Sequence, residues 1–198
     1  VMISIASIVE GDGEVAALPV LLRRLAAELE PFVLVNALPP IRVRRDRFLN
    51  KDEELRRQLL LAASKCGDDG WILIVLDADD DCPSLLGAEI CRRAREYVPH
   101  RRLSVVLANR EFEAWFIAAA QSLDGFRSFA LTSGERVEAE APRNAKGWIR
   151  ERMRGKPYSE VIDQPAFAAR IDLQQALDNS RSFRKLYKEW RTHVIRES

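Results

Sequence analysis

The chain has 198 residues, 47% of them hydrophobic and 31% charged, which is typical of one globular domain with a small appendage. Its formal net charge of +1 excludes a bulk attraction to nucleic acid, so any such binding requires a local basic patch. Three cysteines without CxxC spacing and only two histidines argue against a zinc site, and free thiols favour a cytoplasmic protein. No apolar run is long enough to span a membrane, so we expect no membrane partner.

The chain begins with a segment typical of a strand followed by one typical of a helix. Ile3 to Val9 is apolar and predicts the first strand, which ends at Glu10 and two nearby glycines that permit a tight turn. Glu14 to Glu30 has leucines at helical spacing, with Pro19 inside the pattern, where the helix would start or bend. Phe32 to Val35 predicts a short second strand.

An arginine-rich segment follows, running from Ile41 to Phe48. Its four arginines are Arg42, Arg44, Arg45 and Arg47. Two interpretations remain open, a solvated sheet edge and an arm that contacts the phosphates of a nucleic acid. Leu38-Pro39-Pro40 separates this segment from the preceding strand, because proline supplies no donor to a central ladder. Asp52 to Cys66 then predicts an amphipathic helix.

The central stretch runs from Trp71 to Asp81, beginning as a continuous apolar run and ending in carboxylates. The apolar run fits a strand covered on both faces, as in a parallel sheet. Because unpaired buried charge is costly, we expect the acids at the carboxyl end of this strand, where open α/β sheets bind ligands. Asp77 and Asp79 would point the same way in extended backbone, and paired carboxylates suit Mg²⁺ or Mn²⁺.

The alternative role for these acids is to cap the next helix. Asp80 and Asp81 precede Cys82-Pro83, and proline favours a first helical turn, so capping is the expected role of Asp81 above all. Cys82 to Val98 predicts the helix itself, and Leu103 to Ala108 predicts the following strand.

Charged residues follow this strand as well, in the segment from Asn109 to Phe116. If the segment is helical, Asn109 and Glu113 are four residues apart and share a face. For Glu113, a role in a site and a structural salt bridge are equally open interpretations.

The alternation predicts an α/β fold, with a mostly parallel central sheet flanked by helices, over residues 1–121. Residues 122–198 predict an extension of loops and helices packed on that domain. Leu123 to Arg143 has no clear period and predicts loops or a mobile flap. Lys146 begins a helical region and the densest basic cluster of the chain, for which a solvated helix face is the alternative interpretation.

The chain resembles the TOPRIM superfamily, the metal-binding α/β domain of topoisomerases, bacterial primases and old-lysogenisation (OLD) nucleases. The pattern is an acid after the first strand and an Asp-x-Asp after a later one. It looks closest to a bacterial family of TOPRIM-like proteins. The stretches that carry the resemblance are Val9–Glu14, Leu76–Pro83, Asn109–Phe116, Lys146 and Ser182–Leu186.

The resemblance implies a TOPRIM-like, Rossmannoid sheet and Mg²⁺-dependent phosphodiester chemistry, that is, a nuclease. Glu10, Asp77 and Asp79 would bind Mg²⁺ or Mn²⁺, since all three are expected at carboxyl ends of strands. Glu113 would complete a second metal site or act as general base, and Lys146 would stabilise charge on the phosphate oxygens.

The implied partner is a nucleic acid, DNA in particular, held by its backbone without sequence readout. The residues expected to contact it are Arg42, Arg44, Arg45, Arg110 and Lys146. OLD nucleases carry an ATPase and a TOPRIM domain in one chain. This chain has no ATPase motif, so a separately encoded ATPase of the AAA or ABC type is an expected partner, in phage defence or DNA repair. A homodimer is the other expected assembly.

Three other functions remain open. The first is a non-catalytic subunit that binds metal and nucleic acid, or the ATPase, and cleaves nothing. The second is a phosphatase with an Asp-x-Asp nucleophile, although the motif follows the third strand and Asp77–Asp81 lacks a Thr or Val at its fifth position. The third is a sugar transferase, for which no nucleotide-sugar site is recognisable.

Overall fold

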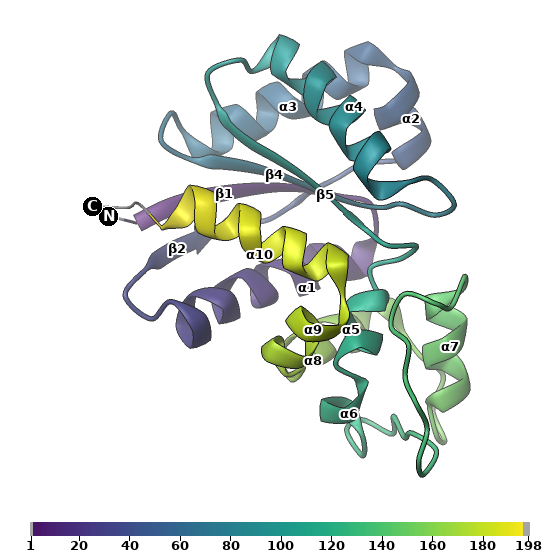
Figure 1. Cartoon of the computed structure of the whole chain (residues 1–198). Helices are drawn as coiled ribbons and strands as arrows, with labels where there is room; N and C mark the ends of the chain where they lie inside the picture. The colour runs from purple at the N-terminus through teal and green to yellow at the C-terminus, as the bar shows by residue number, and fades with distance from the viewer. Residues whose placement is uncertain (1, 196–198) are drawn as a thin grey trace.

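The computed structural model describes residues 2–195 and shows a parallel sheet between two layers of helices (Figure 1). The α/β class with a parallel central sheet, predicted from the alternation, is confirmed. The strands are β1 (Met2–Val9), β2 (Leu34–Ala37), β3 (Ile41–Arg42), β4 (Trp71–Asp77) and β5 (Arg102–Ala108).

The strand order is β2-β1-β4-β5, and every pairing is parallel. β3 pairs with β1 on the side of β2, so the two short strands follow one another along the same edge. Pro39 and Pro40 lie between them and leave the ladder without donors, as the sequence predicts. β4 is buried over its whole length because it lies inside the sheet with helices on both faces.

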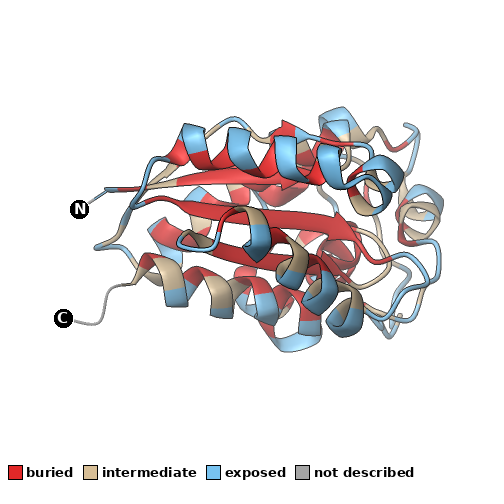
Figure 2. Ribbon diagram, turned by 90° about the horizontal axis from the view of Figure 1, so that it is seen from above, coloured by how far each residue is buried: buried red, intermediate tan, exposed pale blue. Residues whose placement is uncertain are grey.

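The helices of the first half surround the sheet from both sides. They are α1 (Asp12–Arg24), the π-helical turn η1 (Leu25–Leu29), α2 (Arg45–Asn50), α3 (Asp52–Cys66) and α4 (Pro83–Tyr97). α2, α3 and α4 cover one face, and α1 covers the other (Figure 1). Figure 2 shows the consequence for burial, with buried strands between helices whose outer surfaces are exposed.

In the described residues, the second half adds six helices. They are α5 (Ala114–Ala118), α6 (Ala120–Leu123), α7 (Ala145–Arg152), α8 (Glu160–Ala168), α9 (Leu173–Asn179) and α10 (Arg181–Val194). α10 packs against β5 and covers the same face of the sheet as α1, α8 packs on α1, and α7 lies beyond the sheet (Figure 1). One hydrophobic core joins both halves, since it includes Leu18 of α1 as well as Phe167 of α8. Within residues 2–195, every helix is too short or too polar to cross a lipid bilayer.

Two local predictions are wrong. Asn109 is not helical, because the chain turns at Arg110, which has a φ of 70°, and α5 begins only at Ala114. Asn109 and Glu113 therefore do not share a helical face. Asp81 does not cap α4 either, since the N-cap position is Cys82 and no side-chain bond caps it.

Candidate functional site

The carboxyl ends of three neighbouring strands bring acidic residues to one edge of the sheet. Glu10 directly follows β1, Asp77 is the last residue of β4, and Glu113 lies five residues beyond β5. Because these strands are parallel and adjacent, the three acids arrive at the same edge. A fourth acid, Glu14, comes from the first turn of α1. We call these four residues the acid cluster.

The acid cluster lies mostly inside the protein. Asp77 and Glu14 are 7% and 2% exposed, Glu113 is fully buried, and Glu10 is half-buried. The backbone N–H of Phe112 donates to Asp77 Oδ1 at 2.7 Å, and that of Glu10 donates to Glu14 Oε2 at 3.1 Å. These backbone donors hold the two carboxylates in place.

Glu113 is held from the second half of the chain. The Tyr158 hydroxyl donates to Glu113 Oε1 at 3.1 Å, and the Gln164 side-chain amide donates to the same oxygen at 2.8 Å. In the described part of the chain, Glu113 Oε2 and Glu10 Oε2 are buried without a hydrogen-bond partner. Buried oxygens without donors are rare in folded proteins, and a cation is one kind of group that can satisfy them.

Burial raises the pKa of every member of the acid cluster, and repulsion from other members adds to the rise for Glu14 and Asp77. Burial is the largest cause for Glu14, whose pKa rises to about 7, and the charges of Glu10 and Glu113 add to it. The pKa of Asp77 is raised well above its ordinary range by burial and by the neighbouring acids. Burial likewise raises the pKa of Glu10 and of Glu113. Close carboxylates need a cation in order to ionise together.

Lys146 is the cation that faces the acid cluster. It lies in the first turn of α7, with its ammonium 3.3 Å from Glu160 Oε2. Burial lowers the pKa of Lys146, but the charges of four nearby acids, Glu113 and Asp77 foremost, together raise it by more, so the net shift is upward. Lys146 therefore remains protonated and offsets part of the cluster's negative charge.

Asp79 does not have the extended backbone from which the parallel orientation of Asp77 and Asp79 was predicted. Asp79 has a φ of 50°, so the backbone is not extended there, and its side chain is 57% exposed. Its carboxylate lies 3.4 Å from the Arg45 guanidinium. Glu10 nevertheless interacts electrostatically with both aspartates. The charge of Asp79 raises the pKa of Glu10, and the charge of Glu10 raises the pKa of Asp77.

The predicted phosphate-binding arginines border the acid cluster but are partly engaged. Arg45 donates to the Asp77 carbonyl at 3.1 Å and to Asp81 at 2.7 Å. Arg42 pairs with Asp12 at 3.0 Å. A hollow of about 370 Å³ lies between the arginine-rich segment and two acids, Glu10 and Asp79. Its lining residues are Glu10, Arg42, Val43, Arg44, Arg45, Asp46 and Asp79.

Arg110 belongs to a separate ion-pair group on the rim. Its guanidinium lies 2.6 Å from Asp80, which also pairs with Arg143 at 2.7 Å. Hydrogen bonding to Arg143 and the charge of Arg110 lower the pKa of Asp80. Asp80 is therefore a rim acid held by arginines and does not cap α4.

The fit of a divalent cation rests on donor chemistry. Within residues 2–195, no three His, Cys, Asp or Glu side chains already surround a common metal position. The residues nevertheless suit a hard cation, because carboxylate oxygens are the ligands Mg²⁺ prefers and two of them lack donors. Glu10, Asp77 and Asp79 remain the predicted ligands.

The residues absent from the sequence-based prediction are Glu14, Tyr158 and Gln164. Glu14 carries a local signal, since Glu10 and Glu14 are four residues apart at the start of a helix and lie close together. Tyr158 and Gln164 carry none, because their contact with Glu113 depends on how the second half packs.

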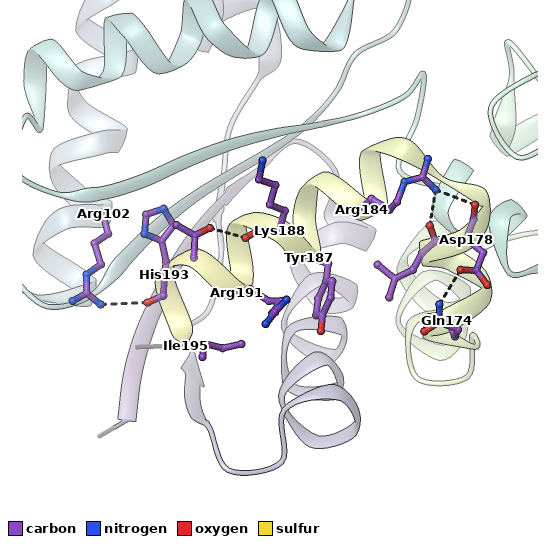
Figure 3. Close-up of a pocket in the computed structure, with 11 residues that line it drawn as sticks. Arg102, Gln174, Asp178, Arg184, Tyr187, Lys188, Arg191, His193 and Ile195 are labelled. Atoms are coloured by element: carbon purple, nitrogen blue, oxygen red, sulfur yellow. Dashed lines mark hydrogen bonds between the residues drawn. The ribbon is translucent and has the colours of Figure 1, made fainter. Parts of the chain in front are cut away.

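A larger hollow of about 1140 Å³ borders α10 (Figure 3), and its lining includes no residue of the acid cluster. Arg102, the first residue of β5, donates there to the carbonyl of His193 at 3.3 Å. Arg184 donates to the Leu177 carbonyl at 2.7 Å and so ties α10 to α9. These contacts stabilise the fold, and this hollow contains none of the predicted site residues.

The fold and the carboxyl edge of its sheet define an α/β protein with a buried acid cluster bordered by arginines. The chain belongs to the family described as Domain of unknown function (DUF4276), whose model matches residues 9–190. The match includes all four acids and Lys146. Comparisons with curated proteins and with solved structures found no match.

Proposed function

We propose that the chain is a TOPRIM-type nuclease that depends on Mg²⁺ or Mn²⁺ and hydrolyses phosphodiester bonds in DNA. The observation that carries the proposal is the acid cluster itself. Four carboxylates meet where parallel strands end, two of their buried oxygens have no donor within the described residues, and Lys146 faces them. An arrangement of this kind, with raised pKa values, is typical of a functional site.

Each residue has a distinct role in this proposal. Glu10, Asp77 and Asp79 would hold the cation, which supplies Lewis-acid activation of a phosphate and of water when bound. Lys146 stabilises negative charge on the phosphate oxygens. Glu14, with a pKa of about 7, is suited to proton transfer near neutral pH, the role predicted for Glu113.

The arginines that border the acid cluster would hold the nucleic-acid backbone. Arg42 and Arg44 are exposed beside the hollow that contains Glu10, and Arg110 pairs with Asp80, next to Asp79 of the same hollow. Contacts of this kind are to phosphates and carry no sequence information. We place this activity in the cytoplasm, where the free thiols of the chain would persist.

The test is a cleavage assay with purified protein, plasmid and single-stranded DNA in Mg²⁺ or Mn²⁺. We expect Asp77→Asn and Glu10→Gln to lose cleavage at least about 100-fold, the scale of a lost catalytic group. Glu89→Gln, on the outer face of α4, is the matched control and should retain activity. Equal cleavage by all four proteins would identify a contaminating nuclease.

The second candidate is a non-catalytic subunit that binds a separately encoded ATPase of the AAA or ABC type. The observation that favours it is the lack of a preformed three-ligand position in the described residues. Titration calorimetry with Mn²⁺ does not separate the candidates, because both bind the cation through Asp77, so the cleavage assay and ATPase binding decide between them. If no nucleic acid is cut and a purified ATPase binds the chain, the subunit replaces the nuclease.

A further inference from the structure

β5 is the last strand of the sheet, yet its edge is recessed. The residues from Leu103 to Ala108 are at most 8% exposed, although no strand lies beyond them in the described structure. Among residues 2–195, the backbone of Leu103 to Leu107 has no hydrogen-bond partner apart from β4. An edge strand of this kind is a template for pairing with another chain.

A groove of about 680 Å³ runs along this edge between α4 and α10. The α4 wall carries small side chains, and the α10 wall carries polar and charged ones. The α4 residues are Pro83, Ser84, Gly87, Ala88, Cys91 and Arg95. On the α10 side, Lys185 pairs with Glu189 at 2.5 Å, and Arg181 pairs with Glu140 at 2.9 Å.

Gly87 is not required by the packing of its own chain. It lies inside α4, where glycine is unfavourable relative to alanine. A Cβ at this position would lie 3.9 Å from Leu107 and 4.0 Å from Val105, which is ordinary contact. Internal packing therefore leaves room for alanine. A glycine without an internal reason, on the wall of a groove, permits a close approach by another backbone.

Because β5 is recessed between α4 and α10, the shape of the groove limits which kind of chain can pair with β5. In a second copy of the chain, β5 would lie between its own α4 and α10. Pairing at the required spacing of about 4.8 Å would press the α4 and α10 walls of the two copies against each other, because these walls flank β5 and leave Leu103–Ala108 at most 8% exposed. A single extended segment without flanking helices has no such obstacle. The groove therefore fits an extended polypeptide and not the β5 edge of another copy.

Charge adds a preference at one end of the groove. Arg95 lies near the amino end of β5, where its charge lowers the pKa of His193. Within the described residues, Arg95 forms no salt bridge, whereas Lys185 and Arg181 are both paired. An unpaired arginine at the end of the groove is complementary to a carboxylate on the bound segment.

We propose that this groove binds an extended segment of a partner protein, which adds to β5 as a sixth strand. The segment has small apolar side chains at alternate positions, which face Gly87 and Ala88, and a carboxylate that reaches Arg95. Backbone hydrogen bonds to Leu103–Leu107 supply affinity, and the alternate side chains supply selectivity. This interaction is independent of the acid cluster and of the proposed nuclease.

The test uses a displayed library of random ten-residue peptides, selected on the full chain. We expect enriched peptides with alternating small residues and an acid, whose synthetic forms slow hydrogen exchange at Leu103–Leu107. In fluorescence anisotropy, Gly87→Leu and Ala88→Leu should each weaken binding at least about ten-fold by filling the groove. Arg95→Ala should weaken it about five-fold or more through the lost charged contact.

The matched control is Arg92→Ala, on the same helix but paired with Glu89 and Glu96 outside the groove. It should change binding less than about two-fold, as expected of an exposed pair. Thermal melts establish that each variant is folded. The proposal is overturned if no peptide is enriched, or if bound peptides are indifferent to both groove-filling variants. A homodimer that Gly87→Leu converts to monomers would also overturn it, since a second copy would then occupy the groove.

Discussion

Glu14 shows how far a residue's surroundings can depart from what its place in the sequence indicates. Carboxylates in a first helical turn are ordinarily exposed and favoured by the helix dipole. Glu14 is instead 2% exposed, with three other acids around it. The start of α1 is therefore part of the candidate site as well as a helix terminus.

The raised pKa of Glu14 makes stability depend on pH. Its pKa is about 7 in the folded chain and 4.5 ordinarily, so the folded state favours the protonated acid. Without a divalent cation, this favourable contribution is complete below pH 4.5 and is lost as pH rises to about 7. The free energy of unfolding should fall by about 3 kcal/mol over that range from Glu14 alone. Glu14→Gln should flatten this part of the plot of unfolding free energy against pH.

Urea unfolding at several pH values in EDTA measures this effect. Glu89→Gln is the control, because that exposed acid pairs with Arg92 outside the acid cluster. A profile for Glu14→Gln that is as steep as the wild type's would contradict the prediction.

Lys146 is the second residue with a pH-dependent role. Lys146→Met removes the cation that offsets Asp77 and Glu113. We expect the free energy of unfolding to fall by about 2 kcal/mol at pH 8, where more of the cluster is ionised, because removing Lys146 leaves buried carboxylates without a positive partner. The loss should be smaller at pH 5, where Glu14 is largely protonated and the cluster carries less negative charge. Chemical denaturation of both proteins at the two pH values tests this, and an equal loss at both would argue against electrostatic compensation.

At the scale of elements, strands and their acidic ends were predictable, because their signals are local. The apolar run of β4 predicted a strand buried on both faces, and Pro39-Pro40 predicted the break between β2 and β3. The parallel order followed from the alternation of strands and helices. The arrival of Glu10 and Asp77 at one edge follows from that order.

The remaining features depend on contacts between distant segments. Asp80 and Asp81 looked like helix caps, but arginines from other parts of the chain hold both. Arg110 turns the backbone before α5, and nothing in its immediate sequence demands a positive φ. Tyr158 reaches Glu113 only because the second half packs over the site. Local patterns contain no information about such pairings.

α4 offers a direct test of the role of its glycine. Gly87→Ala should raise the free energy of unfolding by about 0.5–1 kcal/mol, because alanine is the better helix former and its Cβ has room. Thermal and urea unfolding measure the change. Ala88→Gly, one residue further along the same helix, should lower stability by a similar amount. A destabilising Gly87→Ala would show that internal packing does require glycine.

At the scale of the whole molecule, a net charge of +1 makes any nucleic-acid binding local and sensitive to salt. If the arginine-rich segment contacts phosphates, Arg44→Ala should weaken DNA binding. It should also reduce by about one the slope of log binding constant against log salt concentration. Arg57→Ala, on the outer face of α3 and paired with Glu54, is the control and should leave the slope unchanged. Fluorescence anisotropy in EDTA across a range of salt concentrations separates this binding from cleavage. An unchanged slope for Arg44→Ala would remove that residue from the interface.

The four residues of the acid cluster all precede residue 121, whereas Tyr158, which donates to Glu113, and Lys146, which faces the cluster, come from the region after it. A fragment that stopped before α7 would keep its carboxylates but lose the groups that enclose them. Water would then reach those acids, and they would titrate like ordinary surface glutamates and aspartates. The later helices thus create the unusual chemistry of acids that the earlier strands contribute, so neither half would inherit that chemistry if gene fission separated them.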